Sequence, residues 1–512
     1  MTSITSLYSA ELEGLESRLI KVEVNIKKGI PRFTIVGLAA VNVKESTERV
    51  RIAMENSGYF FPMKNILVNL SPAGIKKDSS WFDLSIATAI LKLSGEIPIP
   101  EDLNEYLFLG ELGLDGAIKP MRGLANILFS STGKNFKYII APSENKIEGS
   151  VSPNHKIFPI SNLSEIRAIF SGEVSPIEPR KQFYFENNPF SENIEIYIDQ
   201  LVAIRCITIA VSGKHHILFS GSPGAGKTMI ARLADKIQPD LSPEEYEDVL
   251  RIKSSTEILN NTESLYLGRP FRSPHHTSSD VSLTGGGKFL RVGEVTLAHN
   301  GILFLDELCE FKSTVIQSLR EPLEEKKITI SRVNYHLTYP SNFLLIAATN
   351  PCPCGYLNND SKSCLCTEER IRKYQSKLSG PFLDRIDLFC EIEPKDNELK
   401  RKKMINLAEI RNIINSTVII QRERFKNYHF KFNGEIEGMD IDKFIEPDIT
   451  ASGLLKKLGE NFKYSIRKLN KIKKISRTIA DLENEKFIKE EHIYEAIQLN
   501  KREKIAIALP SY

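Results

Sequence analysis

The chain has 512 residues, of which 41% are hydrophobic and 26% are charged, a soluble globular composition that excludes a mainly disordered or collagen-like chain. The 68 basic and 65 acidic side chains nearly cancel, so the net charge of +3 identifies no partner. No apolar run approaches the roughly 20 residues that cross a bilayer, and the N-terminal segment lacks a signal-peptide pattern. We therefore predict a cytoplasmic protein without membrane contact. At roughly 150 residues per domain, we expect about three domains.

Residues 1–170 alternate predicted strands and helices. Two alternating apolar strands flank the turn at Gly29–Pro31, and two helical segments end at Gly58 and Gly95. A further strand is predicted at 136–142. This order predicts an α/β domain over residues 1–170.

The next segment, residues 171–193, holds three prolines without periodicity and is predicted to be a linker. Strands and helices alternate again over residues 194–395, which predicts a second α/β domain. Residues 396–512 are helical in pattern and carry 24 basic against 18 acidic side chains. We predict a basic helical domain there.

A glycine-rich segment opens the second α/β domain, and it matches the phosphate-loop pattern G-x-x-x-x-G-K-[ST]. A predicted strand precedes it and a helix follows. Backbone N–H groups of such a turn point at a phosphate, the lysine adds a positive charge and the threonine hydroxyl binds Mg²⁺. The alternative is a glycine-rich turn without a ligand. The predicted ATP and Mg²⁺ residues are Gly221, Ser222, Pro223, Gly224, Ala225, Gly226, Lys227 and Thr228.

Two later apolar strands end in polar side chains. The strand at 301–305 is followed by Asp306 and Glu307, and the strand at 342–349 by Asn350. Parallel strands present such ends at the ligand-binding edge of a sheet. We predict that Asp306 orients Mg²⁺, that Glu307 activates the attacking water and that Asn350 holds that water. The alternatives are an ordinary strand end and an Asn-Pro turn.

These motifs together resemble the magnesium-chelatase-like AAA+ ATPases of the YifB/ComM family. The more specific similarities are RPFRSPHHT at 269–277, GEVTLAHNGILFLDEL at 293–308 and FTIVGLAAVNVKESTERVR at 33–51. The resemblance covers residues 5–500. It implies an AAA+ core with a C-terminal helical lid at 396–512. It departs at Asp199-Gln200, where the family usually has Gly-Gln, a difference that concerns the adenine side of the site.

The resemblance also implies a ring, with six subunits in the family. Arg385 in LDRID would be an arginine finger that acts on the ATP of the neighbouring subunit, and Arg467 would be a sensor arginine that contacts ATP within its own subunit. The alternatives are an ion pair of Arg385 with Asp384 or Asp387, and a solvated basic helix around Arg467.

Four of the seven cysteines lie within residues 352–366, as two C-x-C pairs. Four thiolates suit tetrahedral, structural zinc. Free or redox-labile thiols are the alternative. The predicted zinc ligands are Cys352, Cys354, Cys364 and Cys366.

A β-hairpin is predicted at 324–342, and the resemblance implies that it projects into the pore of the ring. Residues 284–294 form a possible second pore loop. Basic and polar side chains there would contact a DNA backbone, and a solvated hairpin is the alternative. The candidate DNA contacts are Lys326, Lys327, Arg332, Asn334, Lys288 and Arg291. The basic helix at 456–477 is a further DNA candidate or a solvated face, and the adjacent His275 and His276 are expected to shape a loop.

The segments 71–90 and 109–124 resemble the proteolytic domain of Lon, a ribosomal S5 domain 2-like fold. That resemblance places the nucleophilic serine at Trp81 and the lysine at Ala125. Neither side chain can act as nucleophile or base, so we predict the fold without peptidase activity.

The sequence thus predicts an ATP-driven ring motor on DNA, similar to the branch-migration helicases of the family that act when incoming DNA recombines. Two alternatives stay open: a chelatase-type ATPase that remodels a protein partner without DNA, and an ATP-dependent peptidase of the Lon type.

Overall fold

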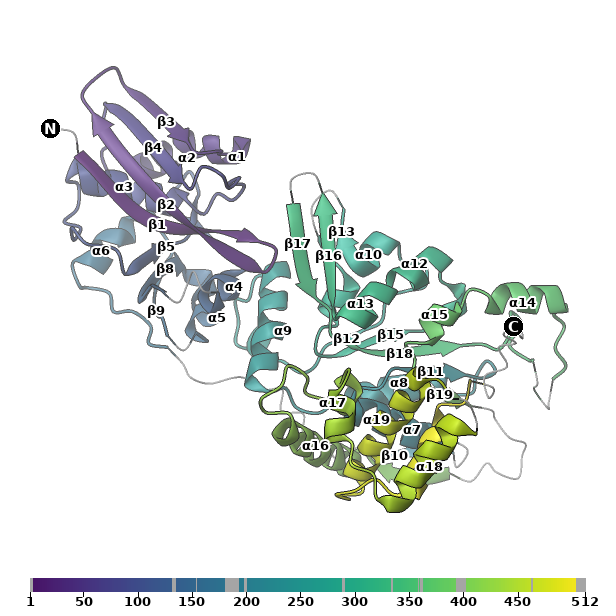
Figure 1. Ribbon diagram of the computed structural model, residues 1–512. Coiled ribbons are helices and arrows are strands. Elements are labelled where there is room, and N and C mark those ends of the chain that lie inside the picture. The colour runs from purple at the N-terminus through teal and green to yellow at the C-terminus, as the bar shows by residue number, and fades with distance from the viewer. Residues whose placement is uncertain are drawn as a thin grey trace. The chain divides into compact units, whose positions relative to one another are not determined.

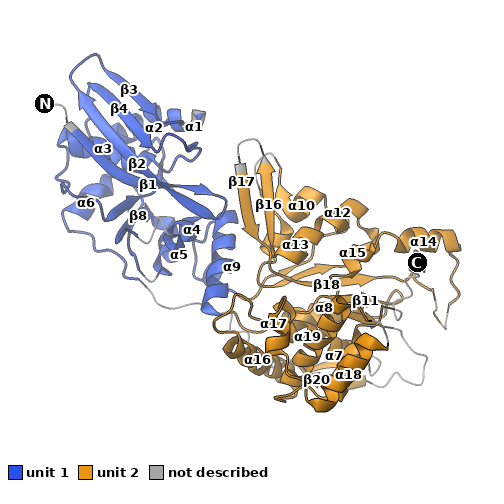
Figure 2. Cartoon of the chain, in the orientation of Figure 1, with its two compact units in different colours: residues 1–186, 242–267 blue, residues 187–241, 268–512 orange. Residues whose placement is uncertain are grey.

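The computed structural model describes residues 3–130, 135–152, 154–179, 193–197, 200–287, 291–332, 335–357, 359, 362–392, 402–461 and 464–502. Two compact units divide the chain, residues 1–186 with 242–267 and residues 187–241 with 268–512 (Figure 2). Within the described residues, no helix is long and apolar enough to cross a membrane.

The first unit is built on a seven-stranded mixed sheet, ordered β3-β4-β2-β1-β5-β8-β9 (Figure 1). The long strands β1 and β2 pair antiparallel around Gly14, whose φ of 66° suits a tight turn. Alternate β2 side chains such as Val22 and Val24 are buried, which fixes the register. The strands are β1 (Ser3–Glu13), β2 (Glu16–Lys27), β3 (Arg32–Val36), β4 (Asn65–Ser71), β5 (Tyr106–Phe108), β8 (Tyr138–Pro142) and β9 (Lys156–Ile160), with a separate pair β6 (Glu111–Leu112) and β7 (Ile118–Lys119).

Helices cover this sheet, and the most deeply buried is α3 (Asp83–Ser94), which ends at the left-handed Gly95 as the sequence predicts. The others are α1 (Val41–Lys44), α2 (Ser46–Asn56), α4 (Leu124–Phe129), α5 (Lys146–Ser150) and α6 (Ile166–Phe170). The predicted linker at 171–193 begins as part of this unit, because Ile177 exchanges two backbone hydrogen bonds with Ile157. Residues 180–192 lie outside the described residues.

One helix of the first unit comes from the middle of the chain. The sequence analysis assigns residues 242–267 to the second domain, but α9 (Pro243–Thr256) packs on α4 instead. Ser254 of α9 donates a hydrogen bond to the fully buried carboxyl of Glu148, and Arg251 donates one to the Leu15 carbonyl at 2.8 Å. Burial raises the pKa of Glu148 to about 7 although three donors surround it.

The second unit contains a five-stranded parallel sheet in the order β12-β15-β18-β11-β19. The three central strands β15, β18 and β11 are short apolar runs buried on both faces, as is typical of a parallel sheet. The strands are β11 (Ile217–Ser220), β12 (Phe271–Arg272), β15 (Ile302–Leu305), β18 (Leu344–Thr349) and β19 (Leu388–Glu391). The helices that accompany them are α7 (Leu201–Gly213), α8 (Lys227–Lys236), α10 (Asp280–Thr284), α11 (Glu294–Leu297), α12 (Ser313–Ser318), α13 (Arg320–Glu325), α14 (Glu368–Gln375) and α15 (Gly380–Leu383).

Two small hairpins belong to this unit. The predicted hairpin at 324–342 is present as β16 (Lys327–Arg332) and β17 (Tyr335–Pro340), which project away from the parallel sheet (Figure 1). The shorter hairpin pairs β13 (Gly285–Gly286) with β14 (Arg291–Val292). A third antiparallel pair joins β10 (Asn193–Tyr197), just after the predicted linker, to β20 (Lys402–Asn406).

The C-terminal region is helical, as predicted, and shares one hydrophobic core with the parallel sheet and α7. Its helices are α16 (Leu407–Arg424), α17 (Asp440–Phe444), α18 (Ile449–Glu460), α19 (Ile466–Leu482) and α20 (Glu490–Leu499). The α/β class, with a parallel sheet and a helical C-terminal region, is therefore confirmed.

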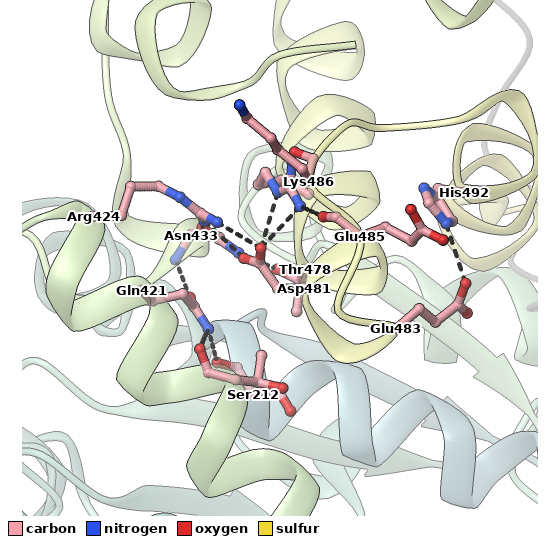
Figure 3. Close-up of polar contacts among 12 residues, drawn as sticks. Ser212, Gln421, Arg424, Asn433, Thr478, Asp481, Glu483, Glu485, Lys486 and His492 are labelled. Carbon is pink, nitrogen blue, oxygen red and sulfur yellow. Dashed lines mark hydrogen bonds and ion pairs between the residues drawn. The ribbon is translucent and has the colours of Figure 1, made fainter. Parts of the chain in front are cut away.

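A buried polar network connects the C-terminal helices to α7 (Figure 3). Asp481 of α19 accepts hydrogen bonds from Arg424 at 2.6 and 2.7 Å and from Asn433 at 2.8 Å. Gln421 continues the network by accepting from the Asn433 N–H and donating to the Ser212 carbonyl at the end of α7. A buried carboxylate is stable only when several donors surround it. The donors to Asp481 come from different segments, so the network holds α16 and α19 in place against α7.

Candidate active site

Three adjacent strands of the parallel sheet end at the same edge and carry the predicted nucleotide residues. The phosphate loop follows β11, Asn350 follows β18, and Asp306 and Glu307 follow β15. Since β18 lies between β11 and β15, Asn350 stands between the loop and the two carboxylates. The structure thus brings together residues that are about 40 to 130 positions apart in sequence.

The phosphate loop has a backbone that only glycine accommodates readily. Gly224 and Gly226 have φ values of 80° and 89°, in the left-handed region. A Cβ atom at Gly221 would lie 2.1 Å from the Ile392 carbonyl oxygen. The loop leads directly into α8, whose first N–H groups lack intrahelical partners and favour an anion.

Lys227 lies largely buried in this loop. Its ammonium donates hydrogen bonds to the carbonyl oxygens of Gly221 and Ser222, at 2.6 and 2.9 Å, and to Oδ1 of Asn350 at 3.0 Å. Burial lowers the pKa of Lys227 to about 8, although the nearby Asp306 and Glu307 carboxylates favour the charged form. An arriving triphosphate would strengthen that charge.

The predicted Mg²⁺ ligands are in contact. The Thr228 hydroxyl donates to Oδ2 of Asp306 at 2.7 Å, and the other Asp306 oxygen accepts the Glu307 N–H at 2.9 Å. A hydroxyl and a carboxylate held together beside a phosphate loop are the oxygen ligands that Mg²⁺ prefers. These residues therefore fit a magnesium ion bound with a nucleotide.

Glu307 has an unusual conformation and an unpredicted partner. Its φ of 51° lies in the left-handed region, which is uncommon for a residue other than glycine. Its carboxylate lies 3.3 Å from Nδ1 of His276, whose ring lies 4.1 Å from that of His275, centroid to centroid. The sequence analysis expects these histidines only to shape a loop, and no spacing rule would have linked His276 to Glu307.

Gln200, at the start of α7, contacts the backbone of the phosphate loop. Its side-chain N–H donates to the Ala225 carbonyl at 3.4 Å, and a Cβ at Gly226 would lie 2.5 Å from the same nitrogen. The Gln of the family's Gly-Gln pair is thus in contact with the phosphate loop here. Asp199, the departure from the pattern, lies outside the described residues.

Arg385 and Arg467 lie together in the structure. Both line a polar cavity of about 720 Å³ that no residue of the phosphate loop lines. Arg385 donates to the Glu324 carboxylate and to the Pro381 carbonyl. Of the two ion-pair alternatives, Asp384 pairs with Arg502, and Asp387 with Lys471 at 3.5 Å. The family resemblance implies different roles for the two arginines: Arg467 would contact ATP within its own subunit, and Arg385 would act on the ATP of a neighbour.

The four predicted zinc ligands converge. The Sγ atoms of Cys352, Cys354 and Cys364 lie 3.4 to 3.6 Å apart, and all four sulfurs lie within 4.8 Å of one another. A tetrahedral ion with Zn–S bonds of about 2.3 Å needs sulfurs about 3.8 Å apart. Burial raises the pKa of Cys354, but backbone hydrogen bonds from Tyr356 and Leu365 outweigh it and lower the pKa to about 6. The cluster fits zinc in geometry.

This cysteine loop lies against the phosphate loop. A Cβ at Gly355 would lie 2.4 Å from Cδ of Pro223, so the two loops are in close contact. The cluster also begins two residues after Asn350. The cluster can therefore support the nucleotide site. With four cysteine ligands, a zinc ion there would have no free coordination position for a substrate.

The structure describes some of the side chains that the sequence predicts to contact DNA. Lys326 pairs with Glu437 at 3.0 Å, and Lys327 and Arg291 are exposed on the hairpins. Lys288 and Asn334 lie outside the described residues, as does the side chain of Arg332.

The basic helix departs from the simple picture of a charged outer face. Arg477 is 2% exposed and donates to the Glu485 and Lys486 carbonyls. Lys474 donates to the Gly434 and Ile436 carbonyls, at 2.8 and 3.2 Å. Lys474 and Arg477 therefore hold neighbouring turns of the C-terminal region together, and Lys474 also lines the cavity of Arg385 and Arg467.

Comparisons with known proteins agree with this arrangement. Residues 194–400 match the family described as Magnesium chelatase, subunit ChlI; residues 22–145 match Subunit ChlI of Mg-chelatase; and residues 405–500 match its C-terminal part. The Uncharacterized protein YifB of Escherichia coli K12 is 35% identical over 99% of both chains. The chain belongs to the YifB/ComM family of magnesium-chelatase-like AAA+ proteins.

Two further proteins of known description are similar to this chain. The Competence protein ComM of Haemophilus influenzae is 33% identical over 97% of both chains. The Probable DNA helicase MCM9 of Arabidopsis thaliana is 25% identical over 178 residues, 35% of this chain and 22% of its own. The resemblance described from the sequence motifs is thereby confirmed.

Proposed function

We propose that the protein is an ATP-hydrolysing ring motor that acts on DNA. The observation that carries this proposal is the meeting of Lys227, Thr228, Asp306, Glu307 and Asn350 at one edge of the parallel sheet. Lys227 and the loop N–H groups bind the phosphates, while Thr228 and Asp306 hold Mg²⁺, which would neutralise charge on the transferring phosphoryl group. Glu307 accepts the proton of the attacking water, and Asn350 orients that water.

Arg385 and Arg467 complete the site from a neighbouring copy. Their shared cavity is separate from the phosphate loop, so one subunit would offer its nucleotide to the two arginines of the next. We therefore revise the role that the sequence analysis gives to Arg467: it acts on the neighbour's ATP together with Arg385. Such a head-to-tail contact closes into a ring, which we propose to be a hexamer.

Three observations favour DNA over a protein partner. The name of the relative ComM refers to competence, and the segment similar to a probable DNA helicase supports a nucleic-acid motor. The projecting β16–β17 hairpin, with Lys327 exposed, offers a surface that can follow a phosphate backbone. We propose branched DNA as the substrate and branch migration as the activity.

The cysteine cluster is proposed to hold one structural zinc ion. The ion would fix the loop that contacts Pro223 and so support the phosphate loop. A peptidase function is disfavoured because Trp81 and Ala125 occupy the places of the Lon serine and lysine.

The test measures ATP turnover of the full chain with and without a four-way DNA junction, at low and high salt. We expect stimulation by the junction that falls steeply with salt, because phosphate contacts release counterions. Lys227→Ala is the control for contaminating ATPases. A turnover rate that the junction leaves unchanged at low salt would refute the DNA motor, and stimulation by a protein partner alone would favour the chelatase-type alternative.

A further inference from the structure

Arg385 is already paired within its own subunit. Its guanidinium donates to the Glu324 carboxylate and the Pro381 carbonyl, and its side chain is only 14% exposed. Its Nε is buried and has no hydrogen-bond partner among the described residues. An arginine that must reach the ATP of a neighbouring subunit therefore has to leave Glu324 first.

Glu324 occupies a junction between two functional regions. It lines the cavity of Arg385 and Arg467, and it also lines a second cavity of about 680 Å³ between the two hairpins, bounded by residues 285–287 and 328–331. It belongs to α13, which ends two residues before β16. The Thr329 N–H of β16 donates to Glu321 of α13 at 3.2 Å, so helix and hairpin are connected.

The ion pair of Arg385 with Glu324 is suited to exchange. The Glu324 side chain is 51% exposed, and ion pairs with an exposed partner are weak because water competes for the carboxylate. A triphosphate carries more charge than a carboxylate and accepts a bidentate guanidinium well. The positive side chain of Arg467 lines the same cavity beside Arg385 and adds to the attraction for such an anion, whereas Lys471 of that cavity is already paired with Asp387.

We propose that Glu324 is a positioning residue that retains Arg385 in the absence of a neighbour's ATP. When the triphosphate takes Arg385, Glu324 is released, and α13 with the β16–β17 hairpin becomes free to move. ATP binding at one subunit interface is thereby linked to the hairpin that contacts the substrate. This inference rests on the proposed function, in which Arg385 acts on the ATP of the neighbour.

The test compares E324Q with E325Q in the full chain. Gln keeps the shape of Glu and removes its charge, and Glu325 is the exposed acidic residue next in sequence. For E324Q, we expect kcat without DNA to rise roughly two- to fivefold, the range of a weak ion pair. We also expect the KM for ATP to stay unchanged, since the phosphate loop is untouched, and stimulation by a DNA junction to fall. E325Q should match the wild type in all three quantities.

The outcomes separate this inference from the proposed function. Wild-type turnover by R385A would reject the role of Arg385 itself. Loss of turnover in R385A, with E324Q indistinguishable from E325Q or slower than it, would overturn only the role of Glu324. E324A removes the carboxylate by a second route and must raise kcat as well, and thermal unfolding of each variant checks that the fold is intact.

Discussion

The lowered pKa of Lys227 predicts that ATP binding depends on pH and takes up a proton. Burial sets this pKa at about 8 in the free protein. About nine-tenths of the Lys227 side chains are then charged at pH 7, and about one-tenth at pH 9. A bound triphosphate favours the ammonium and raises its pKa. Because only the charged form binds well, the affinity for ATP should fall about tenfold from pH 7 to pH 9.

Isothermal titration calorimetry in two buffers of different ionisation enthalpy measures both quantities. Near pH 8, binding should take up about half a proton per site, since half of the side chains are neutral before ATP arrives. Lys227→Arg is the matched variant, because a guanidinium stays charged throughout this range. This variant should bind ATP more weakly than the wild type, and its affinity for ATP should not show the tenfold fall between pH 7 and pH 9. Equal affinity of the wild type at pH 7 and pH 9, with no proton uptake, would refute this account.

Four further predictions concern the shared site and its supports. Glu307→Gln should bind ATP but turn it over at least about 100-fold more slowly, because the base is lost; normal turnover in a steady-state assay would reject Glu307. Arg385→Ala should be inactive alone yet regain part of its activity when mixed with Glu307→Gln, since some interfaces then have both intact halves; a mixture without any activity would argue against action on the neighbour. Asp481→Asn should lower stability by about 3–5 kcal/mol, because Arg424 and Arg477 lose their buried countercharge; an unchanged unfolding midpoint would contradict the network. Purified protein should contain one zinc per chain, and Cys364→Ser should lose it and weaken ATP binding; metal analysis that finds no zinc in freshly purified protein would exclude the site.

The sequence predicts which residues meet at the edge of the parallel sheet, because these residues lie in local motifs at strand ends. Gly221–Thr228, Asp306 and Asn350 each follow a short apolar strand, and a parallel sheet places such ends together. The same reasoning could not find His276, whose contact with Glu307 depends on the path of an irregular segment. Nor could it place α9, whose acidic first turn and apolar face suit a helix in either unit.

The pattern of charged residues in α19 predicts the positions of its basic side chains less well. Ile466, Leu469, Ile472, Ile475 and Ile479 recur at helical spacing, which predicts one packed face; Ile472, Ile475 and Ile479 are buried, but Ile466 at the start of α19 is 76% exposed. The pattern treats the remaining cations as solvent-facing, yet Lys474 and Arg477 donate to carbonyl groups inside the lid. Long basic side chains can satisfy the carbonyl ends of neighbouring turns, and a periodicity argument does not include such tertiary partners.

Lys227 and Arg385, the two cations of the proposed site, are each paired within their own subunit. Lys227 donates to three protein oxygens, and Arg385 donates to Glu324 and Pro381, so neither cation is left buried without partners. A nucleotide must displace both sets of contacts, one in each of two subunits. Displacing the Lys227 contacts is part of the cost of binding ATP, whereas breaking the Arg385 contacts adds to the barrier of turnover, so E324Q is expected to change kcat and not the KM for ATP. In the proposed ring, Arg385 reaches a triphosphate only where a neighbour presents its ATP, so turnover would be a property of the interface and not of the single chain.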